Sequence, residues 1–216
     1  ITMSRPLGDG WQPVTASEVE QEIRAVAKGL VASGINVGDR VAIMARTRYE
    51  WTILDFAIWY AGGCVVPIYE TSSAEQVEWI LNDSGAVAII VETPAHREVV
   101  KPVLTSACKN VWTITDGALD EISNLGNNIS DSDVETRRHA PTPESLATLI
   151  YTSGTTGKPK GCVHLHRSVM FNAVTGAIWS GTGAPDHVTL AVLPMFHVTG
   201  MQISMNAAIY AGAIHG

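Results

Sequence analysis

The first part of the chain alternates amphipathic segments with short apolar runs. A capping-box pattern at residues 15–18 precedes apolar residues at helical spacing, which predicts a helix that ends near Ser33 and is closed by Gly34. The following run, residues 38–45, begins with a glycine turn and continues with apolar residues. It predicts a turn and then a buried strand.

The same alternation continues to about residue 115. In chain order it predicts a helix around residues 51–59, a strand at 63–69, a helix capped at 72–75 and closed by Gly85, a strand at 87–91, a helix after Pro94 that carries Val99 to Leu104, and a strand at 110–115. Short apolar strands separated by amphipathic helices are typical of an α/β fold. We therefore expect mostly parallel sheets covered by helices on both faces.

Residues 116–145 interrupt this pattern. Gly, Asn, Ser, Asp and Pro dominate the stretch, and its charged residues show no apolar periodicity. We expect a surface excursion with at most one short helical turn around Leu119, and we expect its charges to face solvent.

The composition indicates a folded globule. Of the 216 residues, 46% are hydrophobic and 16% are charged, and 14 Lys+Arg against 21 Asp+Glu give a net charge of −7. An acidic chain lacks the cationic surface that attracts nucleic acid, so no nucleic-acid partner is expected. The apolar stretch 51–69 is almost long enough to span a membrane, but Asp55 and the Gly62-Gly63 pair interrupt it. We expect no transmembrane segment.

The three cysteines indicate a reducing compartment. Cys64, Cys108 and Cys162 are widely spaced, odd in number and without a CxxC pair, so neither a disulfide framework nor a zinc site is predicted. The six tryptophans fall mostly in periodic segments, which favours core packing. The start of the chain lacks the features of a secretion signal, and a cytoplasmic location is expected.

The chemistry is concentrated where the apolar strand 146–151 runs into a polar loop. Glycines let backbone N–H groups approach an anion, hydroxyls add donors, and lysines add charge. Together these residue types indicate a site for the phosphates of a nucleotide. The candidate nucleotide-binding residues are Thr152, Ser153, Gly154, Thr155, Thr156, Gly157, Lys158 and Lys160.

Other interpretations of this loop are weaker. Pro159 follows the lysine after Gly157, so no Walker A register fits, and there is no G-x-G-x-x-G turn. A plain polar connector accounts for the glycines and the proline but not for the added hydroxyls and lysines. His164, His166 and His197 lack a further ligand with suitable spacing, and we expect no protein metal site.

The segment from Tyr151 to Gly161 closely resembles the signature of the adenylate-forming (AMP-binding) superfamily, which includes acyl-CoA synthetases, luciferase-like enzymes and nonribosomal-peptide adenylation domains. Residues 68–76 are similar to the N-terminal region of bacterial long-chain fatty-acid CoA ligases. His166 matches the family's histidine after the loop, although Leu165 and Ser168 replace the usual Thr and Asn.

A second match lies at residues 193–201. It resembles the family segment whose histidine, here His197, lies beside the carboxylate of the bound acid, so the resemblance implies that His197 is a catalytic residue. This segment is more similar to short- and medium-chain or aryl-CoA ligases. Its apolar neighbours Phe196 and Val198 alone favour a core histidine, and the resemblance reverses that preference.

The resemblance implies that residues 1–216 are an incomplete N-terminal portion of an AMP-binding (adenylation) domain, inactive by itself. The implied parent is an acid–thiol ligase that uses ATP and Mg²⁺ to convert a carboxylic acid, in particular a fatty acid, to an acyl-adenylate and transfers the acyl group to coenzyme A. Its expected location is the cytoplasm, at most peripheral to a membrane. The alternatives are an amino-acid or aryl-acid adenylation domain and a non-catalytic nucleotide-binding module.

Overall fold

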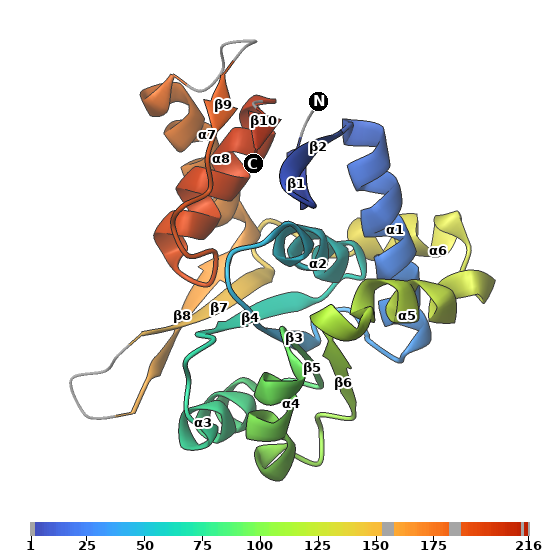
Figure 1. Cartoon of the computed structure of the whole chain (residues 1–216). Helices are drawn as coiled ribbons and strands as arrows, with labels where there is room; N and C mark the ends of the chain where they lie inside the picture. The colour runs from blue at the N-terminus through green and yellow to red at the C-terminus, as the bar shows by residue number, and fades with distance from the viewer. Residues whose placement is uncertain (1–2, 153–157, 182–186, 213, 216) are drawn as a thin grey trace.

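The computed structural model describes residues 3–152, 158–181, 187–212 and 214–215. The described residues form two sheets (Figure 1). The larger sheet has six strands in the order β6-β5-β3-β4-β7-β8. Its strands are β3 (Arg40–Met44), β4 (Cys64–Ile68), β5 (Ala88–Val91), β6 (Asn110–Thr113), β7 (Leu146–Thr152) and β8 (Lys160–Leu165).

All strand pairs of this sheet are parallel except β7 and β8, which are antiparallel. The predicted α/β class with a mostly parallel sheet is therefore confirmed. The smaller sheet combines both ends of the chain: β1 (Met3–Leu7) pairs antiparallel with β2 (Gly10–Val14) and parallel with β10 (Ile214–His215), which in turn pairs with β9 (Val188–Thr189).

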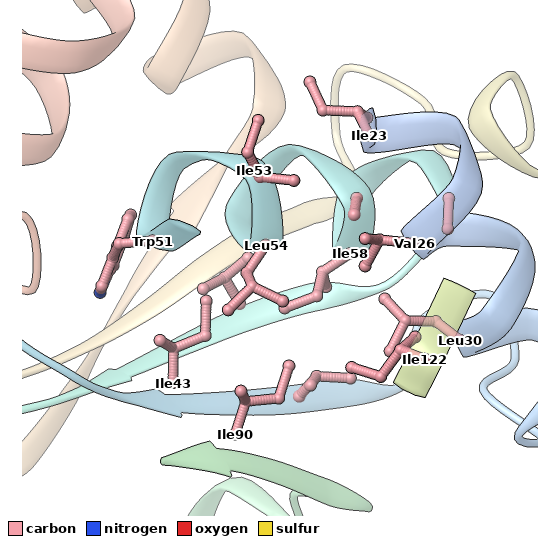
Figure 2. Packing of buried hydrophobic residues seen from close by; sticks show 14 of the residues in the cluster. Ile23, Val26, Leu30, Ile43, Trp51, Ile53, Leu54, Ile58, Ile90 and Ile122 are labelled. Atoms are coloured by element: carbon pink, nitrogen blue, oxygen red, sulfur yellow. The ribbon is translucent and has the colours of Figure 1, made fainter. Parts of the chain in front are cut away.

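One face of the larger sheet is covered by α2 (Tyr49–Tyr60), with α1 (Ala16–Ala32) packed beside it. Figure 2 shows Leu54 and Ile58 of α2 directed toward Ile43 and Ile90 of the strands. These four side chains are completely buried. Burying an aliphatic side chain contributes about 1.5–3 kcal/mol, so this layer is a main source of the stability of the fold.

The opposite face is covered by α3 (Ala74–Ser84) and α4 (Pro94–Val100), which is followed by the 3₁₀ turn η1 (Lys101–Val103). The predicted helix after Pro94 is shorter than expected. Pro102 has no N–H to donate to a helical carbonyl, so the α-helix ends before it and Leu104 is extended.

The predicted capping signals are confirmed for α1 and shifted for α3. Thr15 and Glu18 form the reciprocal hydrogen bonds of a capping box. In α3 the cap is Ser73 rather than Ser72, because Gln76 supplies the returning side chain. Gly85 closes α3 in the left-handed conformation, as predicted.

The expected surface excursion at 116–145 is wrong in one respect, because the stretch contains two helices and not one short turn. After the 3₁₀ turn η2 (Ile114–Asp116) come α5 (Ala118–Leu125), the 3₁₀ turn η3 (Gly126–Asn128) and α6 (Asp131–Arg138). Ile122 and Val134 are completely buried against the core. A few apolar residues are sufficient for such short helices, and they are too few to give a clear periodic pattern.

Contacts with α1 explain how these helices are held. Gly29 of α1 lies so close to Ile122 that a Cβ at position 29 would overlap the Ile122 carbonyl. Lys28 forms an ion pair with Asp131 over 2.9 Å, and Arg24 forms one with Glu135 over 2.6 Å. Two charges of the stretch therefore bind α1, although the Asp131 side chain stays 76% exposed, as expected for a charge that faces solvent.

The last described part packs mainly as helices: α7 (His166–Ser180), the π-helical turn η4 (Gly200–Asn206) and α8 (Ala207–Ala211). Trp11 and Trp179 are exposed by 62% and 86%, so core packing was the wrong prediction for these two tryptophans. Within the described ranges, no helix combines the length and apolar character needed to cross a membrane.

Candidate functional site

The parallel strands bring several polar segments to one edge of the larger sheet. The residues that follow β3, β4 and β5 lie at the carboxyl ends of adjacent strands, which is where open α/β sheets bind ligands. β7 is parallel to β4, with Val65 opposite Thr148. Continuing this register places Thr152, where the loop 153–157 begins, level with Tyr69 at the end of β4.

The segment that carries His197 is fastened to the same edge. The Thr47 hydroxyl, just after β3, donates to the Leu193 carbonyl and accepts from the Met195 N–H, both over 3.1 Å. The rings of Tyr69 and Phe196 are in contact, with centroids 4.5 Å apart. His197 is therefore positioned from the carboxyl ends of β3 and β4.

The His197 ring is exposed, and one of its nitrogens is fixed. Its Nδ1 accepts a hydrogen bond from the Thr199 N–H over 3.2 Å. The backbone N–H of His197 donates to the Pro194 carbonyl over 3.0 Å. A neutral histidine that accepts at Nδ1 carries its proton on Nε2. Gly200 closes the turn, because a Cβ there would overlap the Pro194 carbonyl. The turn thus presents an N–H donor to the outside rather than a core histidine.

Lys160 lies on the sheet face that α2 covers. It pairs directly with Thr152 across β7 and β8, so the two side chains share a face. Ile150 lies on the same face and packs with the buried residues of α2. Tyr151 lies on the opposite face and packs with the buried residues of α3. Lys160 is exposed and no contact with another described residue fixes its ammonium.

Lys158 has a different environment. Its ammonium lies over the ring of Trp79, 4.2 Å from the centroid, and the Trp79 indole N–H donates to the Pro159 carbonyl over 2.8 Å. On the other side of the loop, the Tyr151 hydroxyl donates to the Asp83 carboxylate over 2.6 Å. Burial and this hydrogen bond raise the pKa of Tyr151, which keeps its hydroxyl protonated as the donor.

A charged group lies farther along the edge, at the ends of β3 and β5. The Glu92 side chain is only 4% exposed and binds Arg46 over 2.9 Å and Arg48 over 3.4 Å. Burial opposes ionisation of Glu92, but the hydrogen bonds from Arg46 and the charges of both arginines hold its pKa below the ordinary value. Because the charges compensate each other, we assign this group to structure rather than to chemistry.

The histidines near the loop lie apart from other described side chains of metal-ligand type. In the described part of the chain, no group of three or more His, Cys, Asp or Glu side chains is placed to hold a metal ion. Burial lowers the pKa of both His164 and His166. The His166 ring packs edge-on against Trp59 with centroids 5.7 Å apart, which indicates a packing role.

The structure thus brings Thr152, Lys160 and His197 to one edge of the sheet and places Lys158 against α3. The predicted residues 153–157 lie outside the described ranges. The sequence analysis missed Thr47 and Trp79, which act over long sequence separations. The sequence around each residue gives no sign of these contacts, because a hydroxyl after a strand and an indole in an amphipathic helix are both common.

Exposed hydroxyl and ammonium groups at this edge suit phosphate oxygens. Each hydrogen bond to a charged oxygen contributes about 1.5–3 kcal/mol, so the donors of one loop suffice for a polyphosphate. The described donors fit ATP in this respect. An N–H donor on His197 suits the oxygen of a carboxylate.

Comparisons with known proteins identify the family of the chain. The family described as "AMP-binding enzyme" matches residues 2–216. The long-chain-fatty-acid–CoA ligase FadD15 of Mycobacterium tuberculosis is 44% identical over 214 residues, covering 96% of this chain and 36% of that protein. The long-chain-fatty-acid–CoA ligase ACSBG2 of Xenopus laevis is 27% identical, covering 100% of this chain and 31% of that protein.

The fold also matches solved structures. ATP-bound MatB from Rhodopseudomonas palustris superimposes with a TM-score of 0.85 at 24% identity, covering 99% of this chain and 41% of that chain. The present chain spans a little over a third of the length of FadD15 and less than a third of ACSBG2.

Proposed function

The chain belongs to the AMP-binding enzyme family, and on this premise we propose that it is the N-terminal portion of an ATP-dependent acyl-CoA ligase. The observation that carries the proposal is the common location of Thr152, Lys160 and the His197 segment at the carboxyl edge of the sheet. The proposal assigns phosphate binding to Thr152 and Lys160 and carboxylate binding to His197, and it requires all three on one side of the molecule.

The proposed reaction has two steps. In the first, a carboxylate oxygen of the acid attacks the α-phosphorus of ATP, the bond to the β-phosphate oxygen breaks, and pyrophosphate leaves. In the second, the thiol of coenzyme A attacks the acyl carbon, loses its proton, and displaces AMP. Both steps depend mainly on positioning and on neutralising charge.

Lys160 and the hydroxyls of Ser153, Thr155 and Thr156 are proposed to bind the β- and γ-phosphates. Negative charge grows on these groups as pyrophosphate leaves, so donors fixed there stabilise the transition state more than bound ATP. Mg²⁺ bound with ATP neutralises part of the same charge.

His197 is proposed to orient the acid. The Thr199 N–H holds its Nδ1, which leaves the Nε2–H free to donate to one carboxylate oxygen. The other oxygen then remains available for attack. This role requires a neutral ring with a fixed tautomer and no proton transfer.

We propose a fatty acid as the substrate. The identity of 44% to FadD15, which is named a long-chain-fatty-acid–CoA ligase, supports this class. The similarity of residues 68–76 to long-chain enzymes supports it as well. A reducing location in the cytoplasm is also proposed, since Cys64, Cys108 and Cys162 are all free.

Acid-dependent exchange of labelled pyrophosphate into ATP tests the first step in the full-length protein. We expect exchange with fatty acids and, after addition of coenzyme A, a CoA thioester. Exchange with amino acids and transfer to a carrier-protein thiol would instead identify an amino-acid adenylation domain. Nucleotide binding without exchange for any acid would identify a non-catalytic module. Residues 1–216 alone should form no thioester.

A further inference from the structure

Helix α3 contacts both strands that flank the loop 153–157. On the β8 side, the indole of Trp79 donates to Pro159 over 2.8 Å and its ring lies under the Lys158 ammonium at 4.2 Å. On the β7 side, Asp83 accepts from the Tyr151 hydroxyl over 2.6 Å. Trp79 and Asp83 are one helical turn apart and therefore lie on the same side of α3.

The strand pair is shaped to allow these contacts. Tyr151 lies directly opposite Gly161, and a Cβ at position 161 would come within 3.1 Å of the Tyr151 ring. The missing side chain leaves room for the ring beside β8. Tyr151 is only 3% exposed, so its hydroxyl reaches Asp83 from a fixed position.

The two lysines of the loop region lie in different environments. Lys158 is bound by Trp79 on the α3 side of the hairpin. Lys160 lies on the other face, with Thr152, where the His197 segment is also fastened. A cation that rests on an aromatic ring is partly satisfied there, and moving it to a phosphate would break that contact.

We propose that α3 anchors the nucleotide loop, with Trp79 as the positioning residue. In this account Lys158 is part of the anchor and Lys160 is the lysine that acts on the phosphates. The inference rests on the proposed function, and it adds a role for α3 and divides the work between the two lysines.

The test uses three substitutions in the full-length ligase. Trp79→Ala removes the ring and the N–H, Trp79→Phe keeps a smaller aromatic ring without the N–H, and Tyr151→Phe removes only the hydroxyl. Trp179→Ala is the matched control, because Trp179 is 86% exposed on α7. The measurements are the KM for ATP and kcat in pyrophosphate exchange, the thioester step from preformed acyl-adenylate, and hydrogen exchange of the amides in 158–161.

We expect Trp79→Ala to raise the KM for ATP about tenfold, to leave the thioester step within about twofold, and to speed hydrogen exchange at 158–161. Trp79→Phe and Tyr151→Phe should give smaller changes in the same direction. Adding Lys158→Ala to Trp79→Ala should cause no further change, because Trp79→Ala already removes the contact between the Lys158 ammonium and the Trp79 ring. Trp179→Ala should match the wild type in every measurement.

Two results would overturn the anchor. One is a Trp79→Ala protein that matches Trp179→Ala in KM and in hydrogen exchange. The other is equal loss in both half-reactions, which would mean that Trp79 only supports the fold. If none of the tested acids supports pyrophosphate exchange by the wild type, the proposed function fails. Hydrogen exchange at 158–161 then still tests the anchor independently.

Discussion

The hydroxyl of Thr47 joins two backbone groups that lie 146 and 148 residues later in the chain: it donates to the carbonyl of Leu193 and accepts from the N–H of Met195. This one side chain connects the end of β3 to the segment that carries His197. The ring contact between Tyr69 and Phe196 is a second connection, from the end of β4. The central sheet therefore sets the position of the histidine.

Thr47→Val should weaken binding of the acid. The substitution keeps the shape and removes both hydrogen bonds, each worth about 1 kcal/mol, so the KM for the acid should rise by up to about thirtyfold. Thr47→Ser keeps the hydroxyl and should stay within about twofold of the wild type. Steady-state exchange at varied acid concentration measures both, and identical KM values for the two variants would show that Thr47 does not position the segment.

His197→Gln and His197→Asn should differ. The amide nitrogen of Gln can occupy the place of Nε2. The amide group of Asn reaches only the place of Nδ1, which accepts the hydrogen bond from the Thr199 N–H. Gln should therefore retain more adenylation activity than Asn, with a difference of about tenfold from one hydrogen bond to a carboxylate. The rate of acid-dependent exchange measures this difference. Higher activity for Asn than for Gln would contradict the assigned tautomer.

Local signals were sufficient for most of the fold. The capping box of Thr15 and the glycine after Ser84 mark the ends of α1 and α3, and apolar runs mark the strands, because these preferences act within a few residues. The helices α5 and α6 were missed since each buries few apolar side chains and depends on α1 for support.

In the candidate site, too, local features could be predicted from the sequence and long-range contacts could not. The polar loop and His197 were identified from residue types and resemblance, both of which are local in sequence. The contacts of Thr47 with Met195 and of Trp79 with Pro159 could not be predicted from the sequence, since they exist only after the sheet has formed.

Gly29→Ala should destabilise the protein, although alanine normally favours a helix interior. The new Cβ would overlap the Ile122 carbonyl, so α5 must move away from α1, at a cost of about 1–3 kcal/mol. Gly10→Ala is the matched control, because the nearest atom to its Cβ is 3.9 Å away. Urea denaturation measures both, and equal midpoints would contradict the close approach of α5.

Asp55→Asn should stabilise the protein at neutral pH. Asp55 is completely buried, no described residue bonds its carboxylate oxygens, and burial raises its pKa well above the ordinary value. The folded state therefore keeps the proton while the unfolded state loses it above about pH 4, so stability falls as pH rises by at most about 1.4 kcal/mol per pH unit. The advantage of Asn should grow from pH 4 upward in urea denaturation.

Asp131→Asn is the control, because its effect on stability at neutral pH should be opposite to that of Asp55→Asn. The hydrogen bond and charge of Lys28 lower the pKa of Asp131, so its stabilising contribution is present above about pH 4 and is lost as pH falls through the folded pKa. Removing it should cost stability at neutral pH and little in acid. A pH-independent effect of Asp55→Asn would contradict the assigned protonation of Asp55.

The most direct test of the account compares both half-reactions of Lys160→Ala in the full-length protein. Acid-dependent pyrophosphate exchange should fall by about 10²–10³, as when one preorganised donor is removed, because the proposed function assigns Lys160 to the leaving pyrophosphate. Thioester formation from preformed acyl-adenylate should stay close to the wild-type rate, because the pyrophosphate has already left. Lys109→Ala, at the opposite edge of the sheet, should change neither rate. Equal losses in the two half-reactions would contradict the account and assign Lys160 to the fold or to the acyl group.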